Sequence, residues 1–188
     1  MEQPIIAIAL SIVAALGLAA ACGFRVFVPM LVISGAAKAE MIALNEGFAW
    51  LGTTPALVCL GIATVLEIGA YYIPVVDNFL DTISAPAAVI AGTVVAAAVI
   101  VDIDPWLRWT LAVIAGGGAA AAIKLPMTLT RGASTTTTGG VANPIVSTTE
   151  LVASSAFSAF AVLWPLALPF VALGVVLLLY RRIRRSEA

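Results

Sequence analysis

Long apolar segments separated by short polar segments run through the whole chain. Four of them are free of charged residues and about as long as the roughly 20 helical residues that cross a bilayer. These segments are 3–24, 47–66, 82–101 and 151–180. Lipid admits only helices and closed barrels, and the alternation typical of barrel strands is not seen in these segments. The pattern therefore predicts an all-α, polytopic helical membrane protein, with residues 1–188 forming a single membrane domain.

The apolar segments predict about six transmembrane helices. The first four are expected near residues 4–34, 55–72, 86–101 and 107–127. The last apolar block, residues 144–180, is longer than one helix needs to cross a bilayer at about 1.5 Å per residue. In its middle, Trp164–Pro169 indicates a tight turn between two short spans, and one long kinked helix is the alternative.

Two segments between the spans also need an interpretation. Residues 73–85 are partly apolar, and we expect them to lie along the membrane surface. The segment Thr128–Thr149 is too polar to face lipid, so it is either an ordinary surface loop or the lining of a cavity inside the protein.

Two stretches of the chain resemble each other. Gly17–Arg25 and Gly116–Lys124 are both runs of small residues that lead to a basic residue. Each is followed by a loop and then by a span that begins at a proline and contains a glutamate. Two inverted repeats of three spans, residues 1–104 and 105–188, would give this order, as in many secondary transporters. The alternative is that helices rich in glycine and alanine resemble one another by composition alone.

Composition supports the membrane interpretation and draws attention to the few charges. The chain is 62% hydrophobic and 10% charged, with a mean hydropathy of +1.13, whereas soluble domains carry about 25% charged residues. Within the apolar segments or at their ends lie Arg25, Glu67, Lys124 and Glu150. An ionisable group at bilayer depth costs about 3 kcal/mol or more. These four residues predict either a central polar site on a transport path or structural ion pairs and snorkelling side chains.

Polar residues before and within the last apolar block supply the other candidates. In Thr135–Gly140 and at Asn143, hydroxyl and backbone N–H groups could bind an anion or line an ion path. Thr137, Thr138 and Asn143 are candidates for this reason. The other interpretation is a flexible loop in which Asn143 caps the following helix. Ser154, one turn after the glutamate at 150, either lines a pore or bonds to a carbonyl of its own helix or to a neighbouring helix.

The remaining composition limits the chemistry and the partners. Histidine is absent, and Cys22 and Cys59 lie isolated in apolar runs, so we expect no metal site, no cofactor and no disulfide. Four arginines within residues 181–185 predict a cytoplasmic C-terminus for a multi-pass protein of the inner (plasma) membrane. They indicate membrane lipids as partners, with no nucleic acid. Chains of this size commonly form two-fold homodimers.

Three segments carry a resemblance to a known family. They are Gly17–Leu31, Glu67–Asp77 and Gly139–Glu150. In these segments the chain resembles the bacterial membrane family called domain of unknown function 4126. The family usually has an Asp-Lys pair where this chain has Tyr71 and Tyr72. It usually has an Asn in place of Arg25 and an acidic residue in place of Leu151. The resemblance implies a fold and no activity, with any ion-pair network of the family rewired in this chain.

The favoured function is a transporter or channel for an ion or a small polar solute. It rests on the charges within apolar segments, the two similar halves and the polar Thr/Gly segment. The alternative is a structural or assembly protein of the membrane whose charges only pair helices. An enzyme acting on a lipid is disfavoured, because the chain lacks histidine, a metal-site pattern and a recognisable nucleophile motif.

Overall fold

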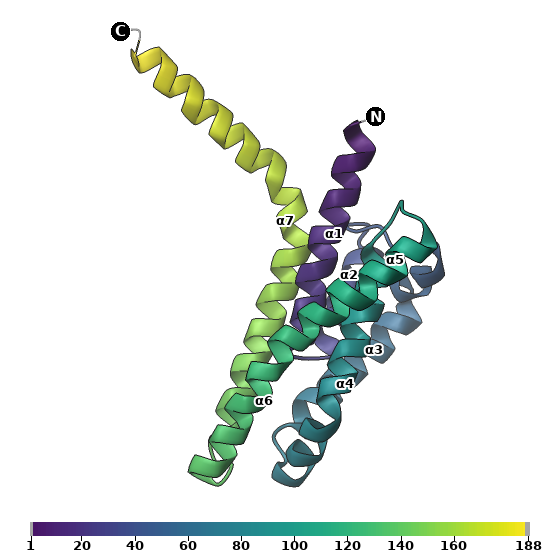
Figure 1. Cartoon of the computed structure of the whole chain (residues 1–188), viewed down its shortest axis with the longest axis vertical. Coiled ribbons are helices and arrows are strands. Elements are labelled where there is room, and N and C mark those ends of the chain that lie inside the picture. Colours follow the sequence, from purple (N-terminus) through teal and green to yellow (C-terminus); the bar gives the residue numbers. More distant parts are fainter. Residues whose placement is uncertain (1, 187–188) are drawn as a thin grey trace.

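The computed structural model describes the backbone of residues 2–186 and the side chains of residues 5–73, 76–77, 79–80 and 82–164. Every regular element in this part of the chain is a helix, which confirms the all-α prediction (Figure 1). The α-helices are α1 (Glu2–Cys22), α2 (Phe27–Lys38), α3 (Thr54–Ala70), α4 (Pro74–Val99), α5 (Pro105–Leu111), α6 (Gly118–Thr138) and α7 (Asn143–Ser186). A 3₁₀-helix, η1 (Glu46–Gly52), precedes α3, and a π-helix, η2 (Ala112–Gly117), joins α5 to α6.

Four helical segments are long and apolar enough to cross a membrane. They are Ile5–Cys22, Thr82–Val99, Pro105–Thr138 and Asn143–Trp164. A fifth span results if η1 and α3, which meet at an angle of 68°, are one broken span. Large apolar side chains such as Val65 and Leu129 point outward, with 69% and 75% of their surface exposed. In a membrane protein, such side chains face lipid.

Helix α1 lies between α7 and α4 and forms the centre of the bundle (Figure 1). The faces that meet there are made of small residues, and Ala15, Ala19 and Ala96 have no exposed surface. A Cβ atom added to Gly116 would lie 2.9 Å from the carbonyl oxygen of Gly92, so the backbones of η2 and α4 touch. Small residues that allow this approach are the usual means by which membrane helices pack.

The first span breaks earlier than the sequence predicts. A helix to about residue 34, kinked at Pro29, was expected, but α1 ends at Cys22 and α2 begins at Phe27. At the break, a Cβ atom on Gly23 would lie 2.5 Å from the carbonyl oxygen of Ala120. Close contact with α6 therefore coincides with the end of α1, and Pro29 falls in the first turn of α2, where its missing N–H costs nothing.

The predicted connection at residues 73–85 is wrong, because residues 74–85 form the first half of α4. Pro74 is in the first turn of the helix, a position that suits proline. Pro86 lies inside the same helix and does not end it. Membrane helices tolerate interior proline when neighbouring groups satisfy the freed carbonyl.

The polar segment Thr128–Thr149 is not a surface loop but mostly helix, and several of its residues line a cavity, as one of the two interpretations predicts. Its first part continues α6 to Thr138, and its last part begins α7 at Asn143. Gly139 and Gly140 make the turn between them with φ angles of 64° and 86°. Left-handed backbone of this kind is the usual glycine-dependent end of a helix. The segment is therefore a tight helical hairpin, and α6 and α7 run side by side from it (Figure 1).

The predicted turn at Trp164–Pro169 is also wrong, and the alternative of one long helix holds. Helix α7 runs without interruption from Asn143 to Ser186 and bends along its length (Figure 1). Prolines in membrane helices cause kinks without ending the helix. Six spans are therefore not confirmed. The orientation predicted from the arginines at 181–185 depends on side chains outside the described ones.

The inverted repeat is not confirmed either. The chain breaks next to Arg25, between α1 and α2, whereas α6 continues past Lys124 to Thr138. The two small-residue runs therefore end in different local structures. Their likeness fits the interpretation that glycine- and alanine-rich helices resemble one another by composition.

Candidate functional site: a buried cluster of arginines and carboxylates

A stripe of polar side chains along α7 faces the interior of the bundle. Its members are three or four residues apart and each is at most 6% exposed: Asn143, Ser147, Glu150, Ser154 and Ser158. This spacing places them on one side of a helix. The opposite side is apolar and exposed, as at Val152 and Phe160. The stripe brings the first half of α7 against α1, α2 and α6 with its polar groups turned inward.

Arg131 of α6 is the centre of the cluster. Its Nε atom donates to Glu150 Oε1 over 2.9 Å, and its Nη2 atom donates to the other oxygen of the same carboxylate. Its Nη1 atom donates to Asp77 Oδ1 on α4. All three side chains are only 1% exposed. A two-fold bonded guanidinium and carboxylate is the strongest ion pair available to side chains, so Arg131 ties α6 to α7 and to α4.

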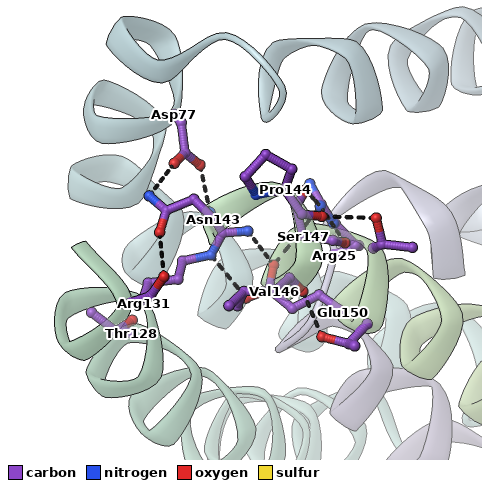
Figure 2. A network of polar contacts seen from close by, with 12 residues as sticks. Arg25, Asp77, Thr128, Arg131, Asn143, Pro144, Val146, Ser147 and Glu150 are labelled. Carbon is purple, nitrogen blue, oxygen red and sulfur yellow. Dashed lines mark hydrogen bonds and ion pairs between the residues drawn. The ribbon is translucent and has the colours of Figure 1, made fainter. Parts of the chain in front are cut away.

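Asp77 and Asn143 close the other side of the cluster (Figure 2). Asn143 Nδ2 donates to Asp77 Oδ2 over 2.9 Å, so both oxygens of Asp77 accept a hydrogen bond. The same amide group donates to Thr135 Oγ1 over 3.2 Å. Ser134 Oγ donates to Asn143 Oδ1 over 2.8 Å. The predicted cap residue Asn143 therefore uses its side chain to join the end of α6 to α4.

Arg25 reaches the cluster from the break between α1 and α2. Its Nη2 atom donates to the carbonyl oxygen of Ser147 over 2.8 Å and also to Ser147 Oγ. The same atom lies 3.8 Å from Glu150 Oε2. The Nε and Nη1 atoms of Arg25 have no hydrogen-bond acceptor among the described residues, although the side chain is 99% buried, with 1% exposed. Unmade hydrogen bonds on a buried charged group are costly, so this half of the guanidinium is a feature that needs a partner.

Tyr71, directly after α3, covers both arginines. The Cζ atom of Arg25 lies 3.9 Å from the centre of the tyrosine ring, and that of Arg131 lies 4.4 Å from it. Guanidinium groups at this distance are attracted by the negative face of the ring. The ring is 5% exposed. On the side of the cluster that faces α3, the ring of Tyr71 therefore packs against both arginines.

Glu67 of α3 binds the backbone at the start of α2. Its Oε1 atom accepts from the N–H of Val26 over 2.9 Å, and its Oε2 atom accepts from the N–H of Phe27 over 3.1 Å. The carboxylate thus caps a helix N-terminus, where unpaired N–H groups and the helix dipole favour a negative charge. The charges of Arg25 and Lys124 also act on it. Lys124 lies on α6 and is 3% exposed.

Two cavities meet this cluster. One, of about 170 Å³, is lined by residues of the α6–α7 hairpin, among them Thr135 and Asn143, together with Tyr71, Tyr72 and Asp77. The other, of about 480 Å³, lies between α2, α3 and α4, with apolar walls and Glu67 and Ser84 among its lining residues. Tyr71 lines both cavities.

Of the eight residues singled out from the sequence, five lie in or beside the cluster and three do not. Arg25, Glu150 and Asn143 are members of the hydrogen-bonded cluster, and Glu67 and Lys124 lie beside it. Ser154 does not line a cavity: it is fully buried, and its Oγ donates to the carbonyl oxygen of Ala21 over 3.0 Å. It therefore joins α7 to α1, which agrees with the interpretation that Ser154 bonds to a neighbouring helix.

Thr137 and Thr138 lie away from the cluster, so the structure does not bring these two candidates together with the others. Both are exposed, and each hydroxyl donates to a carbonyl one turn earlier in α6, over 2.7 Å. Hydroxyls that bond back in this way satisfy their own helix. Of the threonine run, Thr135 is the member that reaches the cluster.

Four cluster residues were not among the candidates: Tyr71, Asp77, Arg131 and Ser147. A signal for Arg131 was present, because it follows Lys124 by seven residues and so lies on the same helix face if α6 continues. Ser147 likewise lies on the face of Glu150. No comparable spacing indicates Tyr71, whose position depends on how the helices pack.

The described residues contain no group of three or more histidine, cysteine, aspartate or glutamate side chains able to hold a metal ion. Within this part of the chain, the two carboxylates of the cluster are instead bonded to guanidinium and amide groups. The arrangement can hold charge away from water and can exchange one hydrogen-bond partner for another. Both properties would suit the binding of a polar group inside the bundle.

Comparison with known proteins agrees with the resemblance seen in the sequence. A family described as domain of unknown function (DUF4126) matches the chain over residues 12–185. No curated protein and no solved structure matches the chain. The match includes the cluster residues from Arg25 to Glu150, and the family description assigns them no activity. The chain belongs to the family described as domain of unknown function (DUF4126).

Proposed function

We propose that this protein is a transporter or channel for an ion or a small polar solute, and that the buried charged cluster is part of its path. The observation that carries the proposal is Arg25: it is 99% buried, with 1% exposed, and two of its guanidinium nitrogens lack an acceptor among the described residues. A group of this kind in a membrane bundle normally faces a partner or a solute pathway.

A purely structural cluster would be built differently. Burying an ion pair seldom stabilises a protein more than well-packed apolar residues would, so architecture alone gives little reason to keep two arginines there. A structural arginine also has its donors occupied, as Arg131 does. Arg25 leaves donors unused at a break between two helices. Interrupted helices at the depth of a polar site are a common feature of transporters.

The two cavities support the same proposal. The cavity of about 170 Å³ lies at the α6–α7 hairpin, and Asp77, Thr135 and Asn143 are among its lining residues. The cavity of about 480 Å³ also adjoins Tyr71. Polar groups and irregular backbone inside a membrane protein are stable where they line a cavity. A solute that crosses the cluster would pass from one cavity to the other.

The setting is also part of the proposal. We place the protein in the inner (plasma) membrane, with its C-terminus in the cytoplasm. The support is the four arginines within residues 181–185, because basic residues next to a span remain on the cytoplasmic side.

The test is flux through vesicles that contain the purified full-length chain. Wild-type protein should release trapped small ions faster than protein-free vesicles do. Glu150→Gln removes the carboxylate that Arg131 and Arg25 share, and Glu67→Gln disturbs the cap on α2. Both variants should lose most of the flux while they remain folded, as judged by a single symmetric peak in size-exclusion chromatography.

Thr149→Val is the matched control, because Thr149 is next to Glu150 but exposed, and its hydroxyl bonds to its own helix. It should keep wild-type flux. Flux no faster than that of protein-free vesicles, for every ion tested, would contradict the proposal and leave the alternative that the charges only pair helices.

A further inference from the structure

Tyr71 stands at the boundary between two cavities. It is the residue that lines both the apolar cavity between α2, α3 and α4 and the smaller cavity at the α6–α7 hairpin, called here the hairpin cavity. Its ring is 5% exposed and lies against the guanidinium groups of Arg25 and Arg131. Tyr71 therefore adjoins both cavities, and its ring covers two arginines that line neither of them.

Behind this ring, Arg25 has hydrogen-bond donors that no acceptor in the described part of the chain uses. The Nε and Nη1 atoms lack an acceptor among the described residues, and the Nη2 atom already serves Ser147. A guanidinium group has only donors and keeps its positive charge at every physiological pH. A partner for the two unused N–H groups must therefore bring acceptor atoms, and a negative charge makes that partner stronger.

The carboxylates of the cluster point to the same class of solute. Both oxygens of Asp77 and both oxygens of Glu150 accept hydrogen bonds from Arg131 or Asn143. Both oxygens of Glu67 accept from the backbone at the start of α2. A cation would have to share each of these oxygens with a donor that already binds it, whereas an anion finds donors that are unused.

We propose that Arg25 is the binding group for a small anion, and that Tyr71 closes the passage between the two cavities over it. The proposal rests on the proposed function and names the solute class and the gate for that path. The hairpin cavity, of about 170 Å³, is large enough for a few water-sized groups at roughly 30 Å³ each. Arg25 does not line it while the Tyr71 ring is in place, so a small anion such as chloride or formate would reach Arg25 from this cavity once the ring turns away.

The position of Tyr71 suits a gate. It lies at the C-terminal end of α3, and only Tyr72 and Ile73 separate it from Pro74, where α4 begins. A short connection between two helices is where small changes in backbone angles can swing a side chain. Turning the ring away would open the apolar cavity to the hairpin cavity and uncover Arg25 at the same time.

The first experiment measures ion selectivity with full-length protein in vesicles, using chloride, formate and potassium as probes. Chloride and formate should cross, and potassium should not. Arg25→Gln removes the charge and the fork of donors, so anion flux should fall about tenfold or more. Passage of potassium without chloride or formate would overturn the proposal, although the proposed function would stand.

The second experiment tests the gate. Tyr71→Ala removes the ring and should raise anion flux several-fold, while Tyr71→Trp should lower it. Phe79→Ala is the matched control, because Phe79 is an aromatic side chain nearby on α4 that is 66% exposed and lines neither cavity. Equal flux in Tyr71→Ala and Phe79→Ala would overturn the role of the ring.

A third measurement separates binding from transport. A ligand that binds the folded state raises the unfolding temperature with its concentration. Chloride should do so in detergent-solubilised wild-type protein, with gluconate as the bulky control anion, and the effect should vanish in Arg25→Gln and weaken in Arg25→Lys. Chloride stabilisation that persists in Arg25→Gln would refute the anion site. If Arg25-dependent stabilisation occurs but no solute crosses vesicles, the site stands and the transport function fails.

Discussion

Arg131 and Arg25 are equally buried, at 1% exposure, yet their surroundings differ. Arg131 lies on an unbroken helix, and three of its nitrogens each bind a carboxylate oxygen. Arg25 lies at a helix break, and one nitrogen makes all of its recorded hydrogen bonds. Burial alone therefore does not tell a structural charge from a functional one. Under the proposed function, the two arginines differ in the number of donors that the fold itself satisfies.

The difference follows from how each arginine is positioned. The α6–α7 hairpin places Arg131 and Glu150 on adjacent antiparallel helices, so their pairing is a local consequence of a tight turn. Arg25 is held in place by contacts with parts of the chain that are distant in sequence, at Ser147 and Tyr71. The predictions below test whether the first arginine mainly sets stability and the second mainly sets function.

The largest effect is expected for Arg131→Met. It leaves Glu150 and Asp77 buried without their cation, and breaking a buried ion pair from one side costs about 3–5 kcal/mol. The free energy of unfolding in detergent should fall by this amount, or the protein should fail to accumulate in the membrane.

A compensated variant makes this prediction specific. Adding Asp77→Asn and Glu150→Gln to Arg131→Met removes both orphaned charges and should recover a large part of the lost stability. A triple variant as unstable as Arg131→Met alone would show that the volume of the arginine, and not its charge, holds the bundle.

Arg25→Met should cost less, about 1–3 kcal/mol. It removes one hydrogen-bonded nitrogen and a ring contact, and it leaves Ser147 and part of Glu150 to be satisfied by others. Chemical unfolding of this variant beside Arg131→Met measures the contrast directly. Equal losses of stability in the two variants would remove the distinction between the two arginines.

Glu67→Ala should cost about 1 kcal/mol, the usual value of a lost helix cap. The N–H groups of Val26 and Phe27 lose their acceptor, so the effect should be local to the start of α2. Hydrogen exchange of these two amides, followed by mass spectrometry, should accelerate while exchange in α6 stays slow. Uniform acceleration throughout the bundle would instead place Glu67 in the stabilising network of Arg131.

The smallest effect is expected for Ser154→Ala, about 0.5–1 kcal/mol from the loss of one buried hydrogen bond to Ala21. Ser155→Ala is the matched control, because Ser155 is the next residue and is exposed. Its unfolding temperature should equal that of the wild type. A drop in Ser155→Ala as large as in Ser154→Ala would contradict the assignment of the buried face of α7.

The sequence predicts the helical membrane class and part of the cluster for one physical reason. A charge in an apolar segment is conspicuous, which is how Arg25, Glu67, Lys124 and Glu150 become candidates. Arg131 and Asp77 are as buried as these, but they lie in segments interpreted as connections, where charges are expected. The prolines at 74 and 86 do not favour a helix at Asp77, and the polar run from 128 does not favour a membrane helix at Arg131.

Other features depend on tertiary contacts that no local pattern records. Glu67 caps α2 only because α1 ends at Cys22, and that end coincides with close packing of Gly23 against α6. Tyr71 reaches two arginines from different helices. A sequence pattern gives the helix face of a residue, but it does not tell which other helix that face meets.

The pairing of Arg131 with Glu150 also constrains how the protein is made. A ribosome delivers α6 before α7, so Arg131 would reach the bilayer without the carboxylate that binds it most extensively. A lone arginine in hydrocarbon is costly, whereas the hairpin is only a few residues long and brings its partner next. Helices α6 and α7 are therefore expected to leave the insertion machinery for the lipid together, as a preformed neutral pair.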